Sequence, residues 1–120
     1  MMIKAAKNTV IFTLIILLIS SYGYSLPQGG AVVSGSASIV SNPANPNYLQ
    51  INQTSNQAIF NWQSFNIGAG QHTHFQQPST SSLAINRING ANGPSEIFGQ
   101  LTATGNIFLL NPSGILFGPS

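Results

Sequence analysis

Two histidines and one carboxylate are the residues of this 120-residue chain whose types allow catalysis or metal binding. His72 and His74 are one residue apart, so an extended strand places both side chains on one side, where they could hold a metal ion. No third ligand is evident, because cysteine and aspartate are absent and Glu96 is distant in sequence. A serine activated by either histidine would lack the carboxylate that orients the base. We therefore interpret both histidines as exposed polar strand positions and expect no enzymatic activity.

The composition excludes further classes of function. Charged residues make up 3% of the chain, against about 25% in ordinary soluble domains. One carboxylate cannot divide general acid and general base roles, and it cannot build a Ca²⁺ site. The absence of cysteine excludes thiolate catalysis, thiolate zinc sites and disulfides. The three Lys and Arg residues are too few for the basic surface that nucleic acids require. We expect no cofactor, no metal and no nucleic-acid partner.

The N-terminus has the three-part order of a secretory signal peptide. Two lysines lie within residues 1–7, residues 10–19 are apolar apart from Thr13, and small residues precede Leu26. The apolar run is shorter than the roughly 20 residues of a membrane-spanning helix. We interpret residues 1–25 as a signal peptide read by the Sec translocon, and residues 26–120 as the mature part. Arg87 and Glu96 are then the two remaining charges, and we expect them to pair across the loop that they flank.

Residues 26–120 have the pattern of short β-strands. Helix propensity is poor, and the apolar residues form short groups that alternate with period two. Clusters of Gly, Pro, Asn and Ser separate the groups about every ten residues in the second half. The expected strand groups are 31–39, 49–51, 58–62, 65–67, 83–88, 97–101, 107–110 and 115–117.

Two all-β architectures fit this pattern, a sandwich or barrel of hairpins and a solenoid of stacked coils. Offsets of roughly 20 residues relate the groups at Ile88 and Ile107 and the groups at Ile97 and Ile115, which favours a solenoid. Stacking also places polar side chains in registered ladders, where Asn and Thr can hydrogen-bond and charges would repel. With that repeat, the mature part would make four to five coils.

Two segments have both a structural and a functional interpretation. Asn111-Pro112-Ser113-Gly114 suits a type I β-turn, because proline presets its backbone angle and asparagine can bond back to the main chain. By itself this predicts a tight corner. Trp62 could stack on a sugar, but its spacing from Phe60 favours packing in the core or at its end.

Several ordered motifs resemble the two-partner secretion (TPS) domain of filamentous haemagglutinin-type exoproteins. The resemblance covers essentially the whole mature part. It rests on Leu26-Pro27-Gln28-Gly29-Gly30 after the signal peptide, residues 60–68 (Phe-Asn-Trp-Gln-Ser-Phe-Asn-Ile-Gly), residues 83–88 (Leu-Ala-Ile-Asn-Arg-Ile), Ile97-Phe98-Gly99-Gln100-Leu101, and Asn111-Pro112-Ser113-Gly114-Ile115.

This resemblance implies a right-handed parallel β-helix with an N-terminal cap, of which this chain holds the first coils. Residues 26–120 would then be a TPS domain truncated at its C-terminal end. It implies recognition by the periplasmic domains of a TpsB-type outer-membrane barrel transporter, and a product that is secreted or displayed on a Gram-negative cell. The secretion motif would be Asn111, Pro112, Ser113, Gly114 and Ile115, with Ser113 where the family usually has asparagine. A second family motif, Asn-Pro-Asn-Leu, has no convincing match. The remaining family positions, in the core and beside it, would be Asn61, Trp62, Phe65, Asn66, Ile67, Gly68, Asn86, Arg87, Phe98 and Gly99.

Other functions remain open at this point. The main alternative is an adhesin head that binds glycans directly, and a further one is an Asn/Gln-rich surface fibre subunit. In a TPS protein, the passenger could be an adhesin, a haem scavenger, a cytolysin or a contact-dependent toxin, and contact with host cells or glycans would be made by that passenger. We also expect the isolated chain to self-associate, because the last coil would expose an unpaired edge.

Overall fold

The computed structural model describes residues 26–118, so the expected signal peptide lies outside the described residues. The described part is all-β, with ten strands and one three-residue 3₁₀ helix, η1 (Gly90–Asn92). It contains no helix long and apolar enough to cross a membrane. The strands are β1 (Ala31–Ser34), β2 (Ala37–Asn42), β3 (Asn45–Gln53), β4 (Gln57–Trp62), β5 (His72–Gln76), β6 (Leu83–Ile88), β7 (Ser95–Ile97), β8 (Gln100–Ala103), β9 (Asn106–Leu110) and β10 (Ile115–Phe117).

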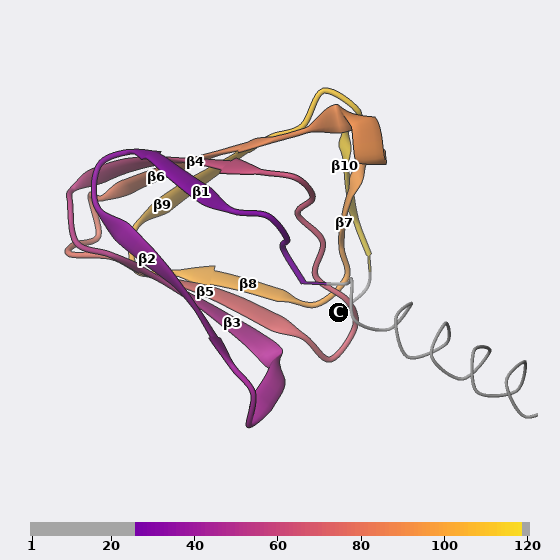
Figure 1. Ribbon diagram of the computed structural model, residues 1–120, viewed down its shortest axis with the longest axis horizontal. Coiled ribbons are helices and arrows are strands. Elements are labelled where there is room, and N and C mark those ends of the chain that lie inside the picture. Colours follow the sequence, from indigo (N-terminus) through magenta and orange to yellow (C-terminus); the bar gives the residue numbers. More distant parts are fainter. Residues whose placement is uncertain (1–25, 119–120) are drawn as a thin grey trace, which may run out of the picture.

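The strands form three sheets on three sides of a shared interior (Figure 1). The sheet orders are β1-β4-β6-β9, β2-β3-β5-β8 and β10-β7. The chain passes the sheets three times in the same sequence, and each pass is called a circuit below. The first circuit holds β3, β4 and a bridge at Ile67, the second holds β5, β6 and β7, and the third holds β8, β9 and β10. Strands of successive circuits pair in parallel, which excludes a sandwich built from hairpins.

The repeat is longer and less regular than the expected 20 residues. Ser95 pairs with Ile115, an offset of 20, whereas His72 pairs with Gln100, an offset of 28. The connections between strands differ in length from circuit to circuit, so the offset differs between sheets. For this reason the described residues make three circuits, and the expectation of four to five coils is wrong.

The first circuit is covered by strands that run in the opposite direction. β1 pairs antiparallel with β4, and β2 pairs antiparallel with β3. The β2–β3 hairpin turns at Asn42, whose side-chain oxygen accepts a hydrogen bond from the Ala44 N–H at 2.9 Å. These two strands therefore cover one end of the stacked circuits. The sequence pattern had counted their residues as part of the stacked solenoid coils.

The interior is apolar and largely aromatic. Phe60, Phe65 and Phe75 have no exposed surface, and Trp62 is 3% exposed. Phe60 and Phe65 each lie within aromatic contact of both Trp62 and Phe75. Buried aliphatic residues of β3, β4, β6 and β7 and of the bridge at residue 67 complete the core: Leu49, Ile51, Ala58, Ile67, Ala84, Ile88 and Ile97.

A ladder of glutamine side chains links the circuits at the corner between the two large sheets. The buried Gln53 donates to the backbone oxygens of Ser55, Asn56 and Leu83. Gln77, one circuit later, donates to Gln53 Oε1 at 3.2 Å and accepts from the Gly105 N–H at 2.7 Å. Polar side chains thus stack in register here, but they are glutamines, whereas the composition predicted ladders of Asn and Thr.

The strand boundaries agree with the sequence pattern in most places. The groups at 83–88 and 115–117 are β6 and β10 with the same limits. The group at 97–101 is divided between β7 and β8 by a turn at Phe98 and Gly99. A Cβ on Gly99 would lie 2.3 Å from the Gly68 carbonyl oxygen, so only glycine permits this close approach. The group at 65–67 contributes only an isolated bridge at Ile67.

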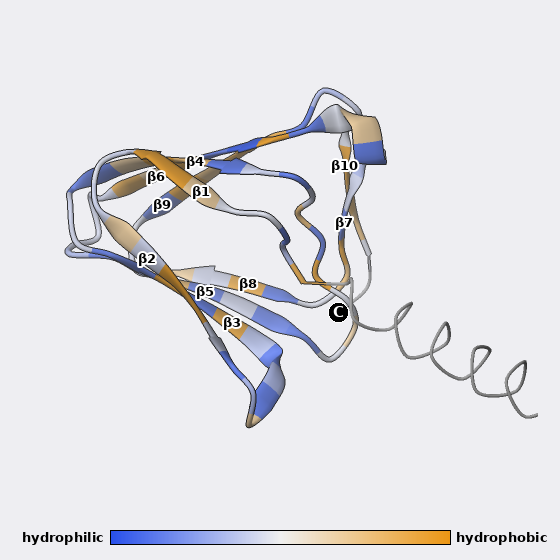
Figure 2. Ribbon diagram, viewed as in Figure 1, coloured by the Kyte–Doolittle hydropathy of each residue, from blue (hydrophilic) through white to orange (hydrophobic). Residues whose placement is uncertain are grey.

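Hydrophilic and hydrophobic residues follow one another along the strands of both large sheets (Figure 2), and the pairing register shows which of them share a row on the outer faces. On the β1-β4-β6-β9 sheet, Ile59, Ile85 and Phe108 occupy paired positions and form an apolar row. On the β2-β3-β5-β8 sheet, the corresponding row is Gln50, His74 and Thr102. The histidines therefore lie on a polar sheet face.

Candidate functional site

The expected secretion motif forms an exposed corner of the third circuit, between β9 and β10. The Gly114 N–H donates to the Asn111 carbonyl oxygen at 2.9 Å and closes a β-turn. Asn111 Oδ1 accepts from the Ser113 N–H at 2.9 Å, which confirms the expected bond from asparagine to the main chain. Gly114 has φ +101°, a backbone angle that favours glycine. Pro112, Ser113 and Gly114 are exposed.

This corner is fixed to the second circuit by side-chain hydrogen bonds. Asn111 Nδ2 donates to the Gly93 carbonyl oxygen at 3.2 Å and to the buried Ser95 Oγ at 3.0 Å. Ser113 Oγ donates to the Gly90 carbonyl oxygen at 2.7 Å. Asn111 thus uses its oxygen for the local turn and its nitrogen for the circuit below, so the exposed residues are held in one position.

An apolar groove lies at the edge formed by the third circuit. β9, β8 and β10 are the terminal strands of their sheets in the described part of the chain. Phe108, Leu110, Leu116 and Phe117 are 52–74% exposed there. The groove is lined by Leu101, Ile107, Phe108, Leu109, Leu110, Ile115 and Phe117. The corner is therefore adjacent to unpaired strand edges and to apolar surface, a combination that suits binding of an extended segment.

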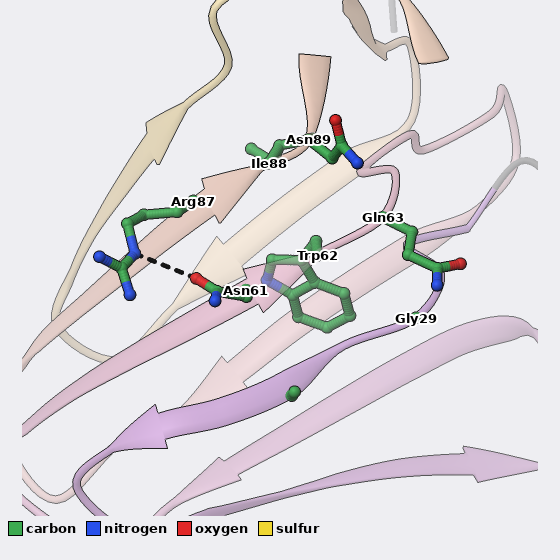
Figure 3. A pocket seen from close by; sticks show the side chains of 8 residues that line it. Gly29, Asn61, Trp62, Gln63, Arg87, Ile88 and Asn89 are labelled. Atoms are coloured by element: carbon green, nitrogen blue, oxygen red, sulfur yellow. Dashed lines mark hydrogen bonds between the residues drawn. The ribbon is translucent and has the colours of Figure 1, made fainter. Parts of the chain in front are cut away.

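The other expected family residues make contacts between successive circuits. Asn86 is fully buried, accepts a hydrogen bond from Trp62 Nε1 at 2.8 Å, and donates to the Phe108 carbonyl oxygen at 3.2 Å. The burial of Trp62 confirms its interpretation as a core residue and leaves no exposed ring face for a sugar. Asn61 and Arg87 lie beside each other on the outer face of the sheet (Figure 3).

Arg87 does not have the partner that the sequence suggested. Its Nε donates to Asn61 Oδ1 at 3.0 Å, and the two side chains line a shallow pocket with Trp62, Gln63 and Asn89 (Figure 3). Among the described residues, no ion pair joins Arg87 to Glu96, because parallel pairing places Arg87 directly opposite Asn61. The expected pairing of Arg87 with Glu96 across the loop is therefore wrong.

The remaining family residues fix the corner that leads from the first circuit to the second. Asn66 Oδ1 accepts from the Glu96 N–H at 2.9 Å, and the Ile67 carbonyl oxygen accepts from the N–H groups of Phe98 and Gly99. The Gly68 N–H donates to Gln71 Oε1 at 2.9 Å. Phe65 and Ile67 have no exposed surface. These residues hold successive circuits in register and are not brought together with the exposed turn at Asn111.

Sequence reasoning missed five buried polar residues, Gln53, Gln77, Ser82, Ser95 and Thr73. The two glutamines are 24 residues apart, so a search of the sequence for a 24-residue repeat of polar residues could have found them. Thr73 Oγ1 is buried without a hydrogen-bond partner. The described residues contain no group of three or more His, Cys, Asp or Glu side chains that could hold a metal ion.

A model of the TPS secretion domain family matches residues 24–120. This chain belongs to the TPS secretion domain family. The match covers the corner at Asn111, all three circuits and the antiparallel strands β1 and β2 that cover the first circuit. The resemblance identified from the motifs is confirmed.

Individual relatives agree with this assignment. The chain is 40% identical over 91 residues to a heme/hemopexin-binding protein of Haemophilus influenzae strain Rd, covering 76% of this chain and 10% of that protein. It is 35% identical over 114 residues to another H. influenzae protein of that name, covering 92% and 12%. The crystal structure of the HMW1 secretion domain from H. influenzae has a TM-score of 0.68 and 35% identity, covering 77% of this chain and 23% of that one. The chain thus spans about a tenth of the length of the two heme/hemopexin-binding relatives.

Proposed function

We propose that the chain directs the secretion, and starts the folding, of a larger exported protein of the adhesin or haemagglutinin type. The match of residues 24–120 to the TPS secretion domain family carries this proposal. In it, residues 1–25 are the signal peptide, the Sec translocon delivers the chain to the periplasm, and a barrel transporter in the outer membrane of a Gram-negative bacterium exports it. The product is secreted or stays on the cell surface, and the chain catalyses no reaction.

The transporter, in this proposal, recognises the corner Asn111–Ile115 through its periplasmic domains. The corner is exposed, yet its turn is held by three side-chain hydrogen bonds to the second circuit. A preformed turn loses little conformational entropy on binding, which favours recognition. The adjacent terminal strands can accept a strand of the partner by edge pairing.

The proposal also assigns the chain a role in folding. The three circuits would begin a right-handed parallel β-helix, with β1 and β2 as its N-terminal cap. The parallel pairing between circuits and the antiparallel cover support this architecture. The first circuit of a stacked array has no template, whereas each later one pairs with a formed edge and buries apolar surface against it. A capped first circuit would therefore let folding advance as the chain leaves the transporter.

A secretion assay with a reporter passenger tests the proposal. The chain is fused to the reporter and co-expressed with the cognate barrel transporter, and reporter is measured in the medium. We expect export that depends on the transporter and binding of the purified chain to the transporter's periplasmic domains. Absence of both would overturn the proposal.

Asn111→Ala, with Asn92→Ala as its matched control, tests the recognition site. Asn92 lies at the neighbouring corner and also donates its side-chain nitrogen to a backbone oxygen, that of Gln63 at 3.0 Å. Asn111→Ala should reduce export at least about tenfold, which corresponds to 1.4 kcal/mol of binding free energy, while Asn92→Ala exports normally. Equal losses in both variants would show that the corner has only a structural role. Ser113→Asn, which restores the usual family residue, should preserve export.

A further inference from the structure

Two ring nitrogens and one hydroxyl converge on the outer face of the β2-β3-β5-β8 sheet. His72 Nε2 lies 2.6 Å from Thr102 Oγ1, and His74 Nδ1 lies 2.7 Å from the same atom. β5 provides both histidines, and parallel pairing places Thr102 of β8 directly opposite His74. The site is removed from the corner at Asn111 and from the contacts assigned to secretion.

The neighbouring side chains define which nitrogen carries each proton. His74 Nε2 lies 3.2 Å from Gln76 Oε1, which can only accept, so His74 carries its proton on Nε2 and has a lone pair on Nδ1. The Thr102 hydroxyl then donates to His74 Nδ1 and accepts from the N–H of His72 Nε2. Tyr48 packs edge-on against the His72 ring, with centroids 5.2 Å apart. The two rings are therefore oriented toward a single point on the surface.

The sequence argued against a metal here because it offered no third ligand, whereas the structure places Thr102 Oγ1 of the next circuit beside both rings. Against that earlier expectation, we propose that His72 Nε2 and His74 Nδ1 chelate a late first-row divalent metal ion, with Thr102 Oγ1 as an oxygen donor and water in the other positions. His74 Nδ1 already presents a lone pair, and His72 does so when its proton moves from Nε2 to Nδ1. Metal–nitrogen bonds of about 2.0–2.1 Å require the rings to rotate toward each other, which half-buried side chains on a sheet surface can do. Imidazole suits Cu²⁺, Ni²⁺ and Zn²⁺, and Cu²⁺ binds tightest in the general order of affinities.

The composition of the chain makes this site easy to test. The chain contains two histidines, one Asp or Glu and no cysteine. Other side chains therefore offer little competition for a soft or borderline metal ion. Mg²⁺, which prefers oxygen ligands, should not compete for the site.

Titration of the purified chain with CuCl₂, followed by calorimetry and by electron paramagnetic resonance, tests the proposal. We expect one Cu²⁺ per chain, coupling to two imidazole nitrogens, and no displacement by excess Mg²⁺. His72→Asn and His74→Asn should each weaken Cu²⁺ binding at least about tenfold. Removing a residue that only hydrogen-bonds to a metal ligand already costs about tenfold or more in metal affinity. The spectrum of either variant should show one imidazole nitrogen.

Control variants distinguish Cu²⁺ binding at the two histidines from Cu²⁺ binding elsewhere on the chain. The double variant His72→Asn/His74→Asn measures any contribution of the N-terminal amine. Gln100→Ala changes the residue opposite His72 on the same sheet face and should leave Cu²⁺ affinity unchanged. Circular dichroism checks that each variant keeps its β-structure. Wild-type affinity in either single histidine variant, or no saturable binding to the wild type, would overturn the proposal.

Discussion

The hydrogen bond between Trp62 and Asn86 offers a stringent test of the packing between circuits. Asn86→Leu keeps a side chain of similar size but leaves the indole N–H of Trp62 buried without its acceptor at 2.8 Å. A buried donor without a hydrogen-bond partner costs about 1–3 kcal/mol of stability. The variant also loses the bond from Asn86 Nδ2 to the Phe108 carbonyl oxygen in the third circuit. The gain from apolar packing of leucine offsets part of this, and we expect a net loss of about 2 kcal/mol in the free energy of unfolding.

A double-mutant cycle with Trp62→Phe isolates this interaction. Trp62→Phe removes the donor, and the double variant removes both partners, so its cost should be smaller than the sum of the single costs by about 1–2 kcal/mol. Urea unfolding followed by far-ultraviolet circular dichroism suits all four proteins, since Trp62 is the single tryptophan and cannot serve as the probe. Single costs that add to within about 0.5 kcal/mol would refute the proposed coupling between the two circuits.

Three further predictions concern burial, backbone shape and the terminal edge. Thr73→Val should raise the free energy of unfolding by about 1 kcal/mol, because it replaces a buried hydroxyl that has no partner; Thr73→Ser, which keeps the hydroxyl, should not stabilise the chain in the same urea titration. Gly99→Ala should cost more than about 2 kcal/mol, since its Cβ would meet two backbone oxygens at 2.3 and 2.4 Å. Gly70→Ala, at φ +80° in open space, should cost only about 1 kcal/mol. The purified chain should self-associate in light scattering, and Leu116→Lys/Phe117→Lys should reduce this because it charges two exposed edge residues; a monodisperse wild-type monomer would contradict the last prediction.

The sequence predicts those features of the fold that depend on nearby residues. Short apolar groups between turn residues place β6 and β10 at their observed limits, and the strand spacing of Phe60 and Trp62 identifies Trp62 as part of the core. The turn at Asn111 follows from the order Asn, Pro and Gly, whose backbone preferences act within four residues. The family itself was identified from five short motifs in the right order, and the family model confirms it.

Features that depend on distant pairing could not be predicted in the same way. The partner of Arg87 is Asn61, 26 residues earlier, because the parallel register and not the nearby loop decides which side chains meet. The turn at Gly99 is dictated by carbonyl groups of the preceding circuit, which no local pattern reveals. The offset between circuits also varies with each connection, so a single repeat length fails for this chain. Most of the expected family residues act in such contacts between circuits.

The register of the circuits gives a physical reason for the very low charge of the chain. Arg87 lies between Asn61 and Leu110 in paired positions, and Glu96 lies beside Asn66 and pairs with Leu116. A second charge of the same sign in either column would lie about 4.7–4.9 Å away. At that distance, two like charges repel by about 1 kcal/mol in water and by 3–4 kcal/mol at an effective dielectric constant of 20. Amide side chains avoid this cost, because each can donate to one neighbour and accept from the other, as Gln77 does between Gln53 and Gly105. A stack that grows by adding circuits thus favours uncharged residues at its paired positions, and neutral polar residues where those positions need hydrogen bonds.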